Sequence, residues 1–144
     1  CVLAGGRFAP DAVTVCPVDA TGRVDLAALA GLLAGGEGRA LVAVMAANNE
    51  TGVIQPLAEV AALCRAHGAG LVVDAVQALG KLPLAIGELD CDALFVSAHK
   101  IGGPQGVGAI VAASEVVAFS PLVRGGGQEG RRRAGTENLP GIAG

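Results

Sequence analysis

Short apolar runs that alternate with helix-like or turn-rich segments constrain the fold of this chain more than any other feature. Each run has the length of a strand and is rich in Val, Ala and Leu, and we expect the first to be buried on both faces. The runs span residues 39–45, 70–73, 93–96 and 107–112. Such alternation is typical of an α/β fold, a mostly parallel sheet with covering helices, and we predict that fold class here.

Capping residues indicate where the helices begin and end. We expect one helix to begin after Asp25, which can accept hydrogen bonds from the first turn. The pair Gly35-Gly36 is expected to end this helix. Pro56 opens a second helix at a first-turn position, and Gly68 stops it. A short β-branched strand is predicted at 12–16, and the chain from 74 to 87 is predicted to be a turn-rich connection.

Composition limits the core and the size of the domain. The chain has 144 residues, of which 52% are hydrophobic and only 2% aromatic, so its core must be built from Ala, Val and Leu. Twenty-three glycines predict tight turns rather than disorder, because the apolar content is too high for a disordered chain. Since residue 1 is Cys rather than Met, we expect residues 1–144 to be one partial domain of a longer protein, incomplete at both ends.

Charge and cysteine usage argue against several kinds of partner. The formal net charge of -3 argues against nucleic acid, because the basic run at 131–133 is only local. No apolar run approaches the roughly 20 residues of a membrane helix. No two cysteines form a CxxC pair, so we predict no metal site. We expect the thiols to be buried or half-buried, in a protein of the reducing cytoplasm. The cysteines are Cys1, Cys16, Cys64 and Cys91.

Reactive and hydrogen-bonding groups gather at the carboxyl ends of the apolar runs. Asn49 follows the first run, Asp74 ends the second, and Ser97, His99 and Lys100 follow the third. Open α/β sheets bind their ligands beyond this edge, so we expect these side chains to share one site. Chance placement would scatter them over both edges of the sheet.

The chemistry of these side chains fits a flat, phosphorylated, electron-accepting ring that is held covalently. The amine of Lys100 can attack an aldehyde once an apolar rim has removed its water. Ser97 and His99 alternate along an extended segment and can both donate hydrogen bonds to a phosphate. The carboxylate of Asp74 can keep a pyridine nitrogen protonated, and the amide of Gln77 can bind a phenolic oxygen.

Four motifs in this order and spacing resemble those of the cysteine desulfurases, in the class V branch of the pyridoxal-phosphate-dependent, aminotransferase-like enzymes. The motifs are NNETG at 48–52, VDAVQ at 73–77, SAHK at 97–100 and GGGQE through RAGTEN at 125–138. The resemblance covers nearly all of 41–144, whereas 1–40 fit it loosely. It implies the large, cofactor-binding domain of fold type I, without the N-terminal part, the small domain and the loop that carries the catalytic cysteine.

The resemblance also implies roles around the cofactor, pyridoxal 5'-phosphate. Lys100 resembles the lysine that binds the cofactor and shuttles protons, and together with His99 it is the expected catalytic pair. Ser97 and His99 resemble ligands of the phosphate, and Asp74 resembles the partner of the pyridine nitrogen.

Three further residues complete the implied site. Asn49 and Gln77 resemble the amides around the phenolic oxygen. Thr136 is similar to a threonine that reaches the phosphate of the neighbouring subunit, which implies a homodimer.

The family converts L-cysteine to L-alanine and an enzyme-bound persulfide, which is passed to a sulfur-acceptor protein for iron–sulfur cluster assembly or thiolation. The family's nucleophilic cysteine and its substrate-carboxylate arginine would lie beyond residue 144. None of the four cysteines matches that nucleophile, so we expect residues 1–144 alone to be inactive.

Other functions stay open. Selenocysteine lyases and other class V lyases or aminotransferases share the same cofactor-binding residues, although the loop at 125–138 favours the desulfurase branch. The segment 125–130 formally fits the GxGxxG pattern of nucleotide-binding modules, but no helix is predicted after it. A non-catalytic fragment would fold in the same way without binding the cofactor.

Overall fold

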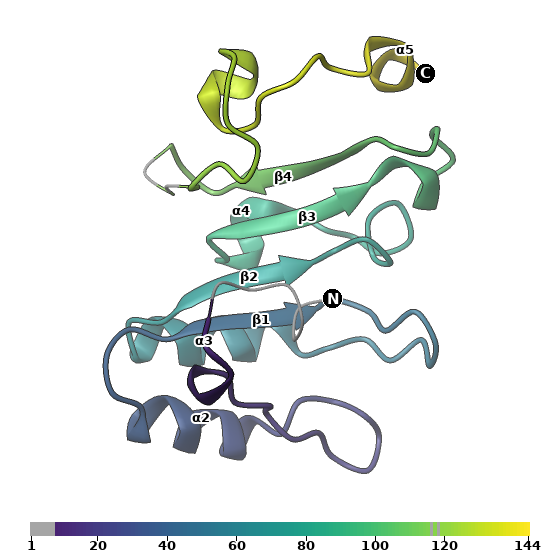
Figure 1. Cartoon of the computed structure of the whole chain (residues 1–144). Coiled ribbons are helices and arrows are strands. Elements are labelled where there is room, and N and C mark those ends of the chain that lie inside the picture. The colour runs from purple at the N-terminus through teal and green to yellow at the C-terminus, as the bar shows by residue number, and fades with distance from the viewer. Residues whose placement is uncertain (1–7, 116, 118) are drawn as a thin grey trace.

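A four-stranded sheet forms the centre of the molecule (Figure 1). The computed structural model describes residues 8–115, 117 and 119–144. The strands lie side by side in chain order: β1 (Leu41–Met45), β2 (Gly70–Asp74), β3 (Ala93–Ser97) and β4 (Gly108–Ala112). The first three are parallel and β4 runs antiparallel to β3, so the predicted mostly parallel sheet is confirmed.

Helices pack on one face of this sheet. The described residues form α2 (Leu26–Gly35), α3 (Leu57–Ala66), α4 (Ile86–Leu89) and α5 (Leu139–Ala143), with 3₁₀ turns at Pro10–Ala12, Ala98–Lys100 and Gln128–Arg131. Figure 1 shows α3 and α4 behind the sheet, and α2 packs in turn against α3. Of the helices in the described part of the chain, none combines the length and the apolar character needed to cross a membrane.

The core lies between α3 and the sheet. Leu71 and Val73 of β2 pack with Val60 and Cys64 of α3, and all four are almost completely buried. Alanines fill most of the remaining core positions, as the composition predicts. Cys64 and Cys91 are buried and Cys16 is half-buried, which confirms their predicted environments, whereas Cys1 lies outside the described residues.

The register of the parallel strands aligns their carboxyl ends. Met45 of β1 lies opposite Asp74 of β2, and Asp74 lies opposite Phe95 of β3. The amide of Ala46 donates to the carbonyl of Asp74 at 2.8 Å, and the amide of Ala75 donates to that of Phe95 at 3.0 Å. The chain therefore leaves β1, β2 and β3 at one common edge, where the sequence analysis places the site.

Two strand predictions are wrong in part. The segment 12–16 is not a strand, because Pro10–Ala12 forms a 3₁₀ turn and the valines that follow meet no partner strand among the described residues. The run 39–45 does form β1, but it is not buried on both faces. Among the described residues β1 pairs with β2 alone, and its alternate side chains face away from the helices, so Leu41 is 52% and Met45 37% exposed.

The helix boundaries follow the capping signals closely. The carboxylate of Asp25 accepts hydrogen bonds from the amides of Ala27 and Ala28, each at 3.0 Å, and α2 begins directly after it. Pro56 occupies the cap of α3 rather than its first turn. The connection 74–87 is turn-rich as predicted, but its end already belongs to α4, a helix of four residues that the sequence analysis did not foresee.

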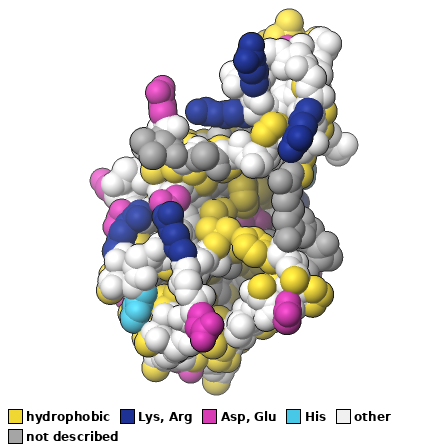
Figure 2. Space-filling view, turned by 60° about the vertical axis from the view of Figure 1, so that its left-hand side comes forward, with side chains coloured by type: hydrophobic (Ala, Val, Ile, Leu, Met, Phe, Trp, Pro, Cys, Tyr) yellow, Lys and Arg dark blue, Asp and Glu magenta, His cyan; other side chains and the backbone are white. Residues whose placement is uncertain are grey.

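The face of the sheet opposite the helices exposes apolar side chains. Because side chains alternate along a strand, the register puts Leu41, Met45, Phe95 and Ile110 on this face. Ile110 is 58% exposed. Figure 2 shows hydrophobic side chains gathered in the hollowed middle of the molecule, below the projecting C-terminal segment that carries arginines.

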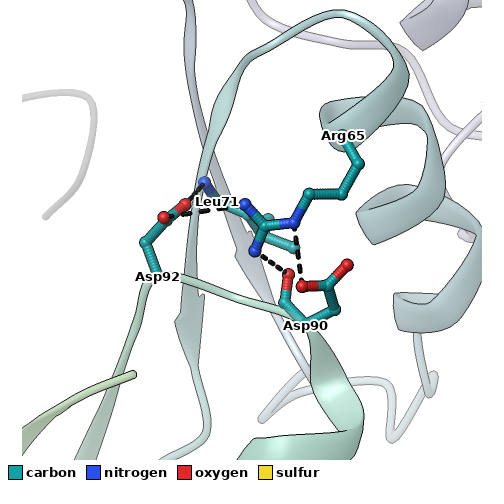
Figure 3. A network of polar contacts seen from close by, with 4 residues as sticks. All are labelled: Arg65, Leu71, Asp90 and Asp92. Atoms are coloured by element: carbon teal, nitrogen blue, oxygen red, sulfur yellow. Dashed lines mark hydrogen bonds and ion pairs between the residues drawn. The ribbon is translucent and has the colours of Figure 1, made fainter. Parts of the chain in front are cut away.

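An arginine joins three elements at the opposite edge of the sheet (Figure 3). Nε of Arg65, in α3, lies 2.8 Å from the carboxylate of Asp90, and Nη2 donates to the Asp90 carbonyl at 2.6 Å. Nη1 lies 3.8 Å from Asp92, whose other carboxylate oxygen accepts from the amide of Leu71 at 2.7 Å. The network therefore ties the end of α3 and the residues after α4 to the start of β2.

Candidate functional site

The end of β3 brings two of the predicted phosphate ligands together. Oγ of Ser97 lies 2.8 Å from Nδ1 of His99. Alternation along an extended chain predicts this proximity, but the chain instead turns at Ala98–Lys100, and the turn carries the imidazole back to the hydroxyl. One hydroxyl and one imidazole at a strand end are groups that can both donate to an anionic oxygen.

Asp74 is held firmly at the end of β2. It is half-buried, and one carboxylate oxygen accepts from the amide of Val76 at 3.0 Å. Its backbone pairs with β1 on one side and with β3 on the other. The position of this carboxylate is therefore fixed by the centre of the sheet.

Lys100 ends the turn that follows β3. The sequence analysis expects an apolar rim to remove water from its amine, but the side chain is exposed in the structure. The turn at Ala98–Lys100 takes the chain out beyond the sheet edge, where the described residues leave the lysine open to solvent. Among these residues the amine is thus accessible to an incoming aldehyde, and the predicted loss of its hydration by burial is wrong.

The two predicted amides line one pocket beside this edge. Asn49 and Gln77 lie in its wall together with Lys81, and the pocket has a volume of about 320 Å³. Nδ2 of Asn49 donates to the carboxylate of Glu50 at 2.6 Å, and Oε1 of Gln77 accepts from Nζ of Lys81 at 2.7 Å. Lys81 is not among the predicted site residues, and its spacing of four residues from Gln77 is the signal in the sequence that points to it.

A glycine contact joins the Gln77 turn to the Lys100 turn. Gly80 has a φ of +74°, which favours glycine, and a Cβ built there would lie 3.1 Å from Cγ2 of Ile101. Ile101 directly follows Lys100. The amide pocket and the amine-bearing turn are therefore packed against each other.

Thr136 does not line the pocket that contains Asn49 and Gln77. Its side chain is exposed, and its carbonyl accepts from Nη1 of Arg133 at 3.4 Å within its own loop. The same C-terminal segment does approach β3, because a second pocket of about 320 Å³ is lined by Ser97, Glu129 and Ile142. Thr136 does not line this second pocket either.

The glycine-rich segment does not build a nucleotide-binding turn. A 3₁₀ turn at Gln128–Arg131 follows it, with Glu129 and Gly130 in left-handed conformations. The dinucleotide fingerprint instead requires a strand before the glycines and an α-helix that begins at their end. The structure thus contradicts this alternative.

Comparisons with known proteins agree on one family. The model of the family described as "Aminotransferase class-V" matches residues 8–144. A cysteine desulfurase from Cereibacter sphaeroides is 48% identical over 128 residues, which are 89% of this chain and 32% of that protein. The chain therefore spans about a third of the length of the curated relatives it matches.

Solved structures of similar proteins share the fold. A NifS-like protein from Rickettsia africae superposes with a TM-score of 0.87 at 41% identity, over 90% of this chain and 36% of that one. A structure described as SspA in complex with cysteine gives a TM-score of 0.81 at 30% identity, over 90% of this chain and 37% of the other.

Proposed function

Because the chain belongs to the class-V aminotransferase family, we propose that it forms the cofactor-binding part of a pyridoxal-phosphate-dependent cysteine desulfurase. The observation that carries the proposal is the common edge where β1, β2 and β3 end. That edge holds the carboxylate of Asp74, the paired Ser97 and His99, and the accessible amine of Lys100. The names of the similar proteins favour desulfurase over selenocysteine lyase or another class V enzyme.

The groups at this edge fit pyridoxal 5'-phosphate one by one. When bound, this cofactor supplies an electron-withdrawing ring that stabilises negative charge on the substrate. Lys100 provides the primary amine that holds its aldehyde carbon and carries a proton to or from the substrate. Asp74 keeps the ring nitrogen protonated. His99 supports the catalytic role of Lys100, because it holds the phosphate of the cofactor next to this lysine.

The remaining polar groups orient the cofactor. Ser97 and His99 donate to the phosphate, and their 2.8 Å contact brings the two donors to one place. Asn49 and Gln77 bind the phenolic oxygen from the wall of the adjoining pocket. We propose that Thr136 serves the site of a second copy, in a homodimer, which is consistent with its exposed position.

For the whole protein, we propose that L-cysteine is converted to L-alanine while its sulfur passes to an enzyme thiol as a persulfide. The buried thiols of Cys64 and Cys91 are unsuited to this attack, because burial raises the pKa of both. We propose that the nucleophilic thiol lies elsewhere in the full enzyme. A sulfur-acceptor protein for iron–sulfur cluster assembly or thiolation would take up the product.

We further propose that residues 1–144 are a partial large domain, inactive by themselves, and that the protein is cytoplasmic. The first proposal is supported by the chain's share of its relatives' length, and the second by free thiols at Cys16, Cys64 and Cys91.

Covalent trapping tests the cofactor assignment. The chain has two lysines, Lys81 and Lys100, so borohydride reduction in the presence of pyridoxal phosphate followed by peptide mass mapping has a clear outcome. We expect the reduced adduct on Lys100, and its loss in Lys100→Ala, while Lys81→Arg keeps it. A folded protein that carries the adduct only on Lys81, or none, would contradict the proposal.

A further inference from the structure

A charged side chain fixes one of the two amides in the pocket. Nζ of Lys81 donates to Oε1 of Gln77 at 2.7 Å, and both residues line the pocket that also contains Asn49. An ammonium group has only donors, so it can bind the oxygen of an amide but not its NH₂ group. Gln77 is therefore held with its oxygen toward Lys81, and its NH₂ group makes no hydrogen bond among the described residues.

The backbone around the two residues makes this contact a built feature. The amide of Leu79 donates to the carbonyl of Ala75 at 2.9 Å, and that of Leu82 donates to Ala78 at 2.9 Å, both over four residues. Such spacing puts positions i and i+4 on one side of the turn, as on a helix. Gly80, with its positive φ and its contact to Ile101, then fixes the turn against the segment after Lys100.

We infer that Lys81 is a positioning residue, which makes Gln77 present a hydrogen-bond donor, rather than its oxygen, to the ring oxygen of the bound cofactor. The inference rests on the proposed function. Without the ammonium, the amide could rotate by half a turn and place its oxygen against that negatively charged oxygen. Lys81 itself does not touch the cofactor in this role, and acts through Gln77.

The absorbance of the cofactor bound to Lys100 reports on this donor. The absorbance maximum of the bound cofactor changes with pH, because the nitrogen that would join the cofactor to Lys100 loses a proton. The ring oxygen of the cofactor helps to hold that proton. A donor from Gln77 draws charge from the ring oxygen and so weakens its hold. We expect Lys81→Met, in the full natural protein loaded with pyridoxal phosphate, to raise the midpoint pH of this change by about one unit, the size of one charge-assisted hydrogen bond.

Three control variants separate positioning from a simple loss of charge. Lys81→Arg keeps the donor and should keep the parent midpoint. Arg39→Met removes an equal charge at the opposite edge of the sheet, from another exposed side chain, and should leave the midpoint unchanged. In a Gln77→Ala background, Lys81→Met should cause no further shift, because the amide that Lys81 orients is gone.

Each outcome decides between the inference and its alternatives. An unchanged midpoint in Lys81→Met overturns the inference alone, provided that the parent carries its cofactor on Lys100. A shift of the same size in the Gln77→Ala background also overturns it, because Lys81 would then act as a bare charge. A parent that forms no adduct on Lys100 overturns the proposed function as well. Because Lys81 is exposed, Lys81→Met is expected to fold, and circular dichroism checks this.

Discussion

At the scale of single residues, two buried thiols make the stability of the protein depend on alkaline pH. Burial raises the pKa of Cys64 and of Cys91, and the opposing charges of Arg65, which lowers both, and Asp92, which raises both, are smaller effects. Above about pH 8.5, the ordinary value of a thiol, the unfolded chain releases protons that the folded chain retains, so the free energy of unfolding falls as pH rises. Below that pH the contribution is fully present.

Denaturant unfolding between pH 7 and 10 measures this effect. The double variant Cys64→Ala, Cys91→Ala should be less stable at pH 7, because each substitution leaves a small cavity. Its stability should nevertheless decline less steeply with pH than that of the parent. Equal slopes in the two proteins would show that the thiols do not contribute.

Ser97 supplies a second prediction at this scale. If its hydroxyl donates to the phosphate of the cofactor, Ser97→Ala removes one charge-assisted hydrogen bond and weakens pyridoxal phosphate binding about tenfold. Fluorescence titration with the cofactor measures the dissociation constant. Ser114→Ala is the matched control, since Ser114 is exposed and follows the far end of β4. An equal loss of affinity for the cofactor in both variants would show that Ser97 does not bind the phosphate.

The residues at strand ends could be predicted because sequence position alone decides at which edge they lie. Asp74 and Ser97 end parallel strands, so their common edge follows from topology. The exposure of Lys100 could not be predicted, and the four-residue spacing of Gln77 and Lys81 signals their contact only where the turn is helix-like. Both depend on turns, whose course is set by local hydrogen bonds and by the left-handed Gly80 rather than by hydrophobic pattern.

At the scale of elements, the Asp92 carboxylate secures the start of β2. Its oxygen is the acceptor for the amide of Leu71, a residue that is only 1% exposed. Asp92→Ala should therefore cost about 1–3 kcal/mol, the penalty for a buried donor without a partner. Asp92→Asn keeps an acceptor and should cost much less. Thermal or denaturant unfolding compares the two, and equal losses would show that the charge matters more than the acceptor.

The arginine of the same network is expected to matter less. The side chains of Arg65 and Asp90 are 42% and 60% exposed, so water competes for both. Arg65→Met should cost no more than about 1 kcal/mol in the same measurements. A loss larger than that of Asp92→Ala would show that the ion pair, and not the backbone acceptor, holds these elements together.

The cap of α2 gives a further prediction for an element. Asp25 accepts from two amides of the first turn, at 3.0 Å each, and Asp25→Ala leaves both without this partner. The expected loss is about 1 kcal/mol of unfolding free energy, whereas Asp25→Ser should restore most of it, because a hydroxyl can also cap. A similar loss in both variants would indicate that the negative charge, rather than the cap, stabilises the helix.

Element boundaries could be predicted where a cap or a glycine marks them, as at Asp25 and Gly68. The failed strand at 12–16 shows the limit of such reasoning. A β-branched run has strand propensity, but only a neighbouring strand can satisfy its backbone, and the sequence does not say whether one is present. The four-residue α4 escaped prediction because a single helical turn is too short to show a period.

At the scale of the whole molecule, the parallel direction of β1, β2 and β3 follows from the alternation of strands and helices, but the direction of β4 does not. A glycine-rich turn of about ten residues joins β3 to β4, with no helix to carry the chain back across the sheet. Parallel strands need such a crossover, so the antiparallel pairing is the result that a short connection allows. As a result, β4 forms the edge of the sheet next to β3.

An apolar sheet face without helices should make residues 1–144, prepared as this chain alone, bind a hydrophobic dye. Leu41 and Ile110 project from that face and are 52% and 58% exposed. A sheet normally buries such side chains, so the dye should fluoresce strongly with the folded chain. The double variant Leu41→Lys, Ile110→Lys should lower this fluorescence by more than half, and its circular dichroism should match that of the parent. Dye binding that is unchanged by both substitutions would show that the dye binds another apolar surface. The exposed C-terminal side chains Leu122 and Leu139 would then be substituted next.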